Sequence, residues 1–206
     1  FRDVVVAHHG NFIGYYRASP RSREAIRKSL GIPSDAHVVL AFGLVRPYKR
    51  VPDLIEAFRS IDRSDFRLLI VGEPTVPEEG RDVEAAAAGD PRIILILERV
   101  PDDRVRELYD AADVAALAYR DVFSSSALLL ALSCCVPVIA PENSTASELA
   151  PPPAVQPYRP GDLAGALVRS AGMPESARDS ALRAAQRYEW DELACAVLHG
   201  HGGSLD

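Results

Sequence analysis

Three cations stand close together after an apolar run of the chain. Arg46, Lys49 and Arg50 fall within five positions, shortly after Gly43. Like charges this close repel one another unless an anion lies among them, and each charge-assisted hydrogen bond to a phosphate contributes about 1.5–3 kcal/mol. Glycine also lets a ligand approach the backbone closely. The cluster therefore predicts a phosphate or pyrophosphate site, with a solvated basic turn as the alternative.

A run of serines marks a second candidate site. Ser124, Ser125 and Ser126 open an apolar helical stretch at 125–133. Free backbone N–H groups and hydroxyl donors at a helix start bind anions readily. A simple N-cap needs only one serine, so the run favours contact with a ligand over capping alone.

Two histidines, His8 and His9, precede a glycine just past the apolar residues at 4–7. Such a pair can act as acid, base or hydrogen-bond donor in a cleft. The alternative is that they satisfy backbone groups in a loop. We keep both as possible cleft residues.

Several sites with strong sequence signatures are missing. No Asp-x-Asp pair and no His/Cys/Asp cluster has metal-ligand spacing, so no metal ion is assigned. No G-x-G-x-x-G follows a strand and no P-loop occurs, and we expect no cofactor. Cys134 and Cys135 have no histidine nearby in sequence, which favours a packing role over nucleophilic chemistry.

The elements that must position these residues alternate along the chain. Apolar runs of strand length alternate with helical stretches, a pattern typical of a doubly wound parallel α/β sheet. The predicted strands lie at 38–43, 66–72, 92–97, 114–119 and 136–141, and the predicted helices between them at 53–61, 82–89, 102–113 and 125–133. In such sheets, ligands bind outside the carboxyl ends of the strands, where the cations and serines fall.

The carboxy-terminal part of the chain differs in composition. Residues 151–162 are too rich in proline for a central strand, so we expect an irregular connection with one short edge strand. Three amphipathic stretches, 162–172, 175–188 and 191–200, predict closing helices.

Composition narrows the classes of protein. The chain has 206 residues, of which 48% are hydrophobic and 25% charged, which is typical of a globular protein. A net charge of −6 argues against a nucleic-acid partner. Three cysteines form no disulfide framework, and no apolar run approaches the ~20 residues that span a bilayer. We therefore expect a reducing, cytoplasmic setting, with peripheral membrane contact of a longer protein left open.

The order of motifs resembles the carboxy-terminal domain of GT-B glycosyltransferases, specifically glycosyltransferase family 4. The motifs are GLVRPYKRVPDLIEAF, FRLLIVGE, RIILILERVPDDRVRELYDAADVAALAY, SSSALLLALSCCVPVIAPENSTASEL and YEWDELA. The resemblance implies a Rossmann-like domain that binds a nucleotide-sugar donor without a metal, while a missing amino-terminal domain binds the acceptor. By this analogy 1–20 is a crossover segment, 21–188 the donor-binding domain and 189–206 a helix and flexible tail.

The resemblance also implies roles for single residues. Lys49 matches the lysine on the donor pyrophosphate, and Arg46 replaces an arginine whose usual place holds Leu44. These two are the expected catalytic residues, beside Gly43. The segment of Glu98, Arg99 and Val100 matches the cradle of the base, and Ser124 to Ala127 match the helix start that holds the phosphates. Two family glutamates, for donor sugar and ribose, are replaced by Val122 and Leu130, and a family glycine by Cys135, which indicates a divergent branch.

The expected function is transfer of a sugar from a UDP- or GDP-activated donor to a glycan, lipid-linked or natural-product acceptor. The alternatives are a nucleotide-sugar epimerase of the same fold and a non-catalytic binding or scaffold domain; a receiver-like regulatory domain ranks last because it lacks clustered acids. The isolated chain should bind donor without turnover. Uncovered apolar surface near Phe12, Tyr15 and Tyr16 makes self-association an open expectation.

Overall fold

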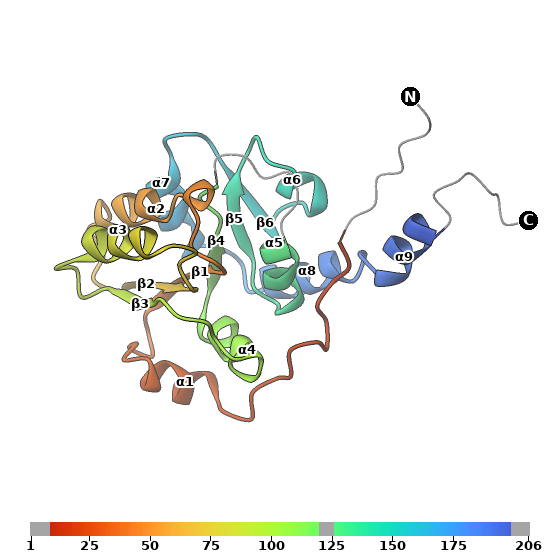
Figure 1. The fold of residues 1–206 in the computed structure, drawn as a ribbon, viewed down its shortest axis with the longest axis horizontal. Helices are drawn as coiled ribbons and strands as arrows, with labels where there is room; N and C mark the ends of the chain where they lie inside the picture. Colours follow the sequence, from red (N-terminus) through yellow and green to blue (C-terminus); the bar gives the residue numbers. More distant parts are fainter. Residues whose placement is uncertain (1–8, 120–125, 199–206) are drawn as a thin grey trace, which may run out of the picture.

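The computed structural model describes residues 9–119 and 126–198. They form one parallel sheet in the order β3-β2-β1-β4-β5-β6, which confirms the expected α/β class (Figure 1). The strands are β1 (His37–Phe42), β2 (Phe66–Val71), β3 (Ile93–Ile96), β4 (Val114–Ala116), β5 (Val138–Pro141) and β6 (Val155–Tyr158). Because neighbouring strands run parallel, their carboxyl ends meet at one edge of the sheet.

The strand order reverses between β1 and β4. The chain runs outward from β1 through β2 to β3, then returns to place β4 on the other side of β1. Loops that leave adjacent strands in opposite directions open a crevice at this switch point, and open α/β sheets bind ligands there. The residues that follow β1 and β4 therefore lie where a ligand site is expected.

Helices cover both faces of the sheet (Figure 1). Helices α2 (Val51–Arg59), α3 (Pro77–Ala87) and α7 (Leu163–Ser170) cover one face; α4 (Asp102–Ala111), α5 (Ser126–Ser133) and α8 (Ser176–Ala185) cover the other. Alternate residues of β1 enter different cores: Val39 packs with the α2 side, whereas Leu40 packs with the α5 side. Burial on both faces explains why the strands are continuously apolar.

The remaining helices lie outside these layers. Helix α1 (Arg23–Ser29) packs on α4, a short α6 (Ala146–Leu149) follows β5, and α9 (Trp190–Leu198) ends the described chain. Helices α1 and α6 were not predicted from the sequence. Helix α3 begins before the expected residue 82, at Pro77, because the Glu79 carboxylate accepts hydrogen bonds from the Thr75 amide (2.9 Å) and hydroxyl (2.7 Å). The proline-rich segment forms the predicted edge strand, β6.

Asp113 ties the amino-terminal edge of the sheet together. Its carboxylate accepts hydrogen bonds from the Val38 amide (2.7 Å), from the Arg27 guanidinium (2.7 Å) and from Arg23. Burial raises the pKa of this carboxyl, but the Val38 amide and the two guanidinium groups outweigh it, so the pKa falls below its ordinary value. One side chain thus fixes α1 against β1 and the start of β4.

An aromatic segment runs beside α9. The Asn11 amide donates to the carbonyl of Tyr188 (2.8 Å), and the indole of Trp190 donates to the carbonyl of Asn11 (2.7 Å). Tyr15 is 67% exposed and Trp190 is 49% exposed. Tyr15 and Trp190 are therefore exposed aromatic side chains, and self-association through this region stays a prediction.

Candidate functional site

The loops after β1 and β2 are locked together by close backbone contact. The Gly43 amide donates to the carbonyl of Val71 (2.9 Å), and the Val45 amide donates to the carbonyl of Glu73 (3.0 Å). Gly72, at φ +153°, leaves no space for a side chain, because a Cβ there would overlap the carbonyl of Gly43. The two glycines therefore set the shape of this part of the sheet edge.

Lys49 lies in the crevice at the switch point. It ends a 3₁₀ turn (Pro47–Lys49) whose first residue fixes the backbone angle, and its ammonium turns back to the strand end. Nζ lies 3.5 Å from the carbonyl oxygen of Phe42 and 5.7 Å from the ring centroid of Tyr119, which follows β4. The side chain thus bridges the ends of β1 and β4.

Burial changes the acidity of Lys49. Removal from water, with a smaller contribution from nearby Arg46, lowers the pKa of its ammonium to about 8. Desolvation disfavours the charged form, and a second cation adds repulsion. A bound anion would act in the opposite direction, because a nearby negative charge raises the pKa of an ammonium.

The other two cations have different surroundings. Arg46 is exposed at the start of the turn. Arg50 adopts a left-handed backbone (φ +50°) and forms an ion pair with Asp53 in the first turn of α2. Asp53 therefore balances the charge of Arg50 within the chain, and the role of the cation cluster in binding phosphate stays a prediction.

The predicted base-binding segment lines a hollow next to Gly43. We call it the strand-end hollow; its volume is about 270 Å³ and its lining residues are Phe42, Gly43, Leu44, Gly72, Glu73, Glu98, Arg99 and Val100. The structure thus brings four of the predicted donor residues together: Gly43 from the β1 end and the three-residue segment after β3. Glu98 and Arg99 are exposed, whereas Val100 is half-buried.

The serine candidates are only partly visible. Ser126 and Ala127 begin α5, with Ser126 exposed and Ala127 half-buried. Ser124, Ser125, Val122 and His8 lie outside the described residues. Leu130, a residue of α5, is 6% exposed and packs into the core, so it presents no group to a ligand.

His9 belongs to the aromatic segment beside α9. Its ring lies 4.6 Å from that of Trp190 and 5.1 Å from that of Phe12, and its Nδ1 is 2.7 Å from the Gly10 carbonyl oxygen. His9 is absent from the residues that line the strand-end hollow. These contacts match the loop alternative; a place in a cleft stays a prediction.

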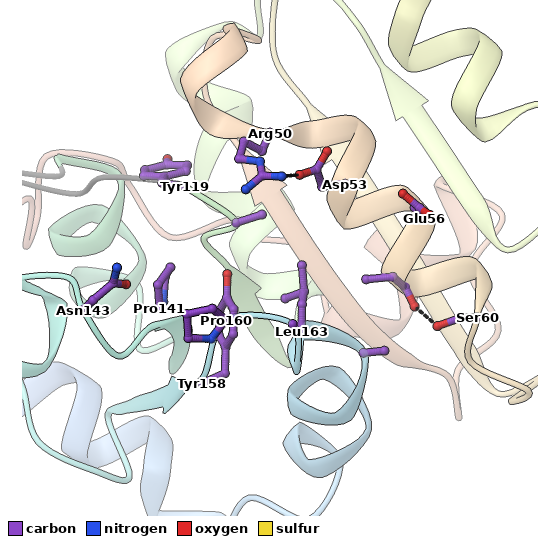
Figure 2. Close-up of a pocket in the computed structure, with 14 residues that line it drawn as sticks. Arg50, Asp53, Glu56, Ser60, Tyr119, Pro141, Asn143, Tyr158, Pro160 and Leu163 are labelled. Atoms are coloured by element: carbon purple, nitrogen blue, oxygen red, sulfur yellow. Dashed lines mark hydrogen bonds and ion pairs between the residues drawn. The ribbon is translucent and has the colours of Figure 1, made fainter.

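A larger pocket has Tyr119 among its lining residues. We call it the side pocket; it has a volume of about 570 Å³ between α2 and the segment after β6. Figure 2 shows the Arg50–Asp53 ion pair near the start of α2, with Tyr119 next to Arg50 and with Tyr158, Pro160 and Leu163 across the pocket. Tyr158, at the end of β6, donates its hydroxyl to the carbonyl of Leu117 (3.1 Å), and burial raises its pKa to about 12.

Two site residues were missed from the sequence. Tyr119 contacts Lys49 by its ring, and Glu73 lines the strand-end hollow beside Glu98. Both residues follow a strand directly or within a few positions. That place in the chain, at the carboxyl ends of β4 and β2, was the available signal.

Residues 9–119 and 126–198 contain neither a candidate metal site nor a candidate membrane-spanning helix. Within these ranges no three His, Cys, Asp or Glu side chains gather in a way that could hold a metal ion. No helix in the same part of the chain has the length and apolarity to cross a membrane.

Solved structures share this architecture. The chain superposes on Anabaena HepE in complex with UDP with a TM-score of 0.74 at 20% identity, covering 95% of this chain and 56% of that one. It also matches the carboxy-terminal domain of the group 1 glycosyl transferase LpcC from Francisella tularensis, with a TM-score of 0.61 at 20% identity over 83% of this chain and 92% of that one. At such identities the likeness shows the fold, which is that of one half of a GT-B glycosyltransferase.

Sequence comparison supplies the family. Residues 22–167 match the model described as glycosyl transferases group 1, so the chain belongs to this family, as the resemblance implied. A GDP-mannose:glycolipid 4-beta-D-mannosyltransferase from Xanthomonas campestris pv. campestris is 37% identical over 150 residues, 73% of this chain and 40% of that protein. A D-inositol 3-phosphate glycosyltransferase from Xylanimonas cellulosilytica is 28% identical over 187 residues, 86% of this chain and 45% of that protein. The chain therefore spans less than half the length of these two relatives.

Proposed function

We propose that this chain is the donor-binding part of a glycosyltransferase that moves a sugar from a UDP- or GDP-activated donor to a glycan, lipid-linked or natural-product acceptor. Membership of the group 1 family supports the reaction class. Both nucleotides are candidates because the Xanthomonas relative is named for GDP-mannose and the Anabaena structure contains UDP.

The observation that carries the proposal is the position of Lys49. A half-buried ammonium between the ends of β1 and β4 has a pKa lowered to about 8 and meets no carboxylate in the described structure. A buried cation without a counter-ion is costly, and a diphosphate would supply the missing charge. The strand-end hollow next to it would take the nucleoside.

Catalysis in this proposal is electrostatic. As the bond between sugar and diphosphate breaks, negative charge develops on the leaving oxygen, and fixed positive groups lower the energy of that state. Lys49 and Arg46 are placed to do this, with the start of α5 at Ser126 and Ala127 assisting. The acceptor would bind to a further domain. The greater length of the relatives is consistent with such a domain.

A double substitution tests the assignment. Arg46→Ala with Lys49→Ala should abolish binding of GDP and UDP measured by calorimetry, while circular dichroism and the melting temperature stay close to those of the unsubstituted chain. The matched control, Arg17→Ala with Lys28→Ala, removes two exposed cations before and on α1 and should leave binding unchanged. Retained binding in the first variant would refute the roles of Arg46 and Lys49.

A non-catalytic binding domain is the second candidate function. Leu130, at the place of a family glutamate, is buried in the core and offers no hydrogen bond to a donor. An epimerase of the same fold is a third. One experiment separates the three: a longer protein that includes this chain is incubated with donor alone and then with donor and acceptor. A glycosyltransferase modifies the acceptor, an epimerase isomerises the free donor, and a binding domain changes neither compound.

A further inference from the structure

The strand-end hollow contains two carboxylates from different strands. Glu73 follows β2 and Glu98 follows β3, and these strands are neighbours in the sheet. The other lining residues are the apolar Phe42, Leu44 and Val100, the cation Arg99 and the two loop glycines. A flat, partly apolar group fits such a lining, and the two acids add hydrogen-bond acceptors at its rim.

Neither carboxylate is used by the fold. No hydrogen bond or ion pair joins the side-chain carboxylate of Glu73 or of Glu98 to another residue of the described ranges. Glu79, nearby in the chain, differs because its carboxylate is occupied by Thr75. The two acids of the hollow therefore remain available to a ligand.

The chemistry of the bases separates the two candidate nucleotides. Guanine presents an N1–H and an amino group side by side, two donors that a carboxylate can accept together. Uracil presents one N–H between two carbonyl oxygens. A carboxylate that accepts from this N–H is therefore repelled by the partial negative charge of a neighbouring carbonyl oxygen. Charge-assisted pairs are the strong ones, and repulsion of the wrong partner adds to the discrimination.

We infer that the strand-end hollow selects guanine over uracil, with Glu73 and Glu98 accepting hydrogen bonds from the N1–H and amino group of a GDP-activated donor. This inference rests on the proposed function, because it takes this edge of the sheet to bind a nucleotide. Arg99 and Lys49 balance the added negative charge, on the base side and the phosphate side respectively. The role of the acids would be specificity, while the diphosphate supplies binding common to both nucleotides.

A set of nucleotides tests the inference directly. Calorimetry should give affinities in the order GDP, IDP, UDP, with GDP at least about tenfold tighter than UDP, since one good bidentate pair contributes that much discrimination. IDP lacks only the amino group of guanine, so equal affinity for GDP and IDP would overturn the pairing. Equal or tighter binding of UDP would overturn the inference and leave the proposed function standing. Binding of none of the three would instead refute the proposed function.

A pair of substitutions then assigns the selectivity to the acids. Glu73→Gln with Glu98→Gln replaces acceptor-only groups by amides that can also donate to uracil oxygens. The ratio of GDP to UDP affinity should fall about tenfold or more. The control, Glu78→Gln with Glu84→Gln on α3, removes two exposed acids outside the hollow and should keep the ratio. An unchanged ratio in the first variant, as expected if these acids only met the ribose that both nucleotides share, would overturn the inference.

Discussion

At the scale of single residues, Lys49 couples burial to charge. Its ammonium is desolvated at the switch point, near a carbonyl and an aromatic ring, and its pKa is lowered to about 8. The charged form that a diphosphate needs is therefore lost at a lower pH than for an ordinary lysine. This gives the site a pH dependence of its own.

The first prediction concerns that pH dependence. Nucleotide affinity should fall as the pH rises through about 8, because Lys49 loses its proton in the free protein. Lys49→Arg should move this fall to higher pH, since a guanidinium stays charged. Calorimetry at several pH values, corrected for buffer ionisation, measures both. The same fall in both proteins would show that another group controls binding.

The stability of the ligand-free chain should rise with pH over a range in which nucleotide affinity falls. The unfolded state holds the Lys49 proton up to its ordinary pKa near 10.5, whereas the folded state releases it from about 8. The unfolded state therefore binds more protons between these values, and stability rises with pH across that window. Denaturant unfolding with and without Lys49→Arg separates this contribution from the rest.

Gly43 provides the second prediction. A Cβ at this position would lie 2.7 Å from Nζ of Lys49, and its φ of +105° disfavours any other residue. Gly43→Ala should therefore displace the ammonium and weaken nucleotide binding, in addition to costing about 1 kcal/mol of stability from the backbone.

Gly31→Ala is the matched control for this variant. Gly31 also has positive φ (+69°), yet nothing lies within 4 Å of the Cβ it would carry. Stability should fall in both variants, while affinity falls only in Gly43→Ala. Equal affinities in the two variants would contradict the role given to Gly43.

At the scale of elements, α5 ends in a Schellman motif with an unusual residue. The Val136 amide donates to the carbonyl of Ala131 (2.9 Å), and the Cys135 amide donates to the carbonyl of Leu132 (3.0 Å). Cys135 occupies the left-handed position at φ +60°, where glycine is usual. The resemblance implies a glycine at this position, and a left-handed backbone is less favourable for cysteine than for glycine.

The third prediction follows from this helix end. Cys135→Gly should raise the free energy of unfolding by up to about 1 kcal/mol, because glycine adopts positive φ without the steric cost. Cys134→Ala, at the neighbouring buried position, should lower it, since it removes buried volume from the core. Chemical denaturation measures both. A loss of stability in Cys135→Gly would mean that packing of the thiol outweighs the backbone strain.

Elements differed in how well the sequence predicted them. The strands and longer helices were predicted because their apolar patterns reflect burial on one or both faces. Helix α1 was missed because only Ile26 and Arg27 are buried in it, and Arg27 is held by Asp113 and by backbone carbonyls from outside the helix. Tertiary contact, rather than local propensity, stabilises such an element.

At the scale of the whole molecule, the chain matches part of longer proteins. The superposition includes 95% of this chain but 56% of the Anabaena structure. The proposed donor site lies at the carboxyl ends of the strands, at the switch point between β1 and β4. Sugar transfer needs an acceptor placed opposite this edge.

The fourth prediction is that these 206 residues bind nucleotide without transferring sugar. A saturating nucleoside diphosphate at about 100 times its Kd should stabilise the fold by about 2.7 kcal/mol, because it binds only the native state. Thermal unfolding measures the shift, with the Arg46→Ala/Lys49→Ala variant as the unresponsive control. Transfer of sugar to acceptor by this chain alone would contradict the proposed division of labour.

The sequence by itself determined the order of strands and helices and the presence of cations just past the first strand, because burial and turn chemistry are written in local residue patterns. Only the tertiary structure decided which side chains meet. It placed Tyr119 against Lys49 because β1 and β4 are neighbours in the sheet although two strands separate them in the chain. It also turned Arg50 to Asp53, set Glu73 beside Glu98 in one hollow and lowered the pKa of Lys49, since ion pairing, shared cavities and desolvation depend on the packed fold.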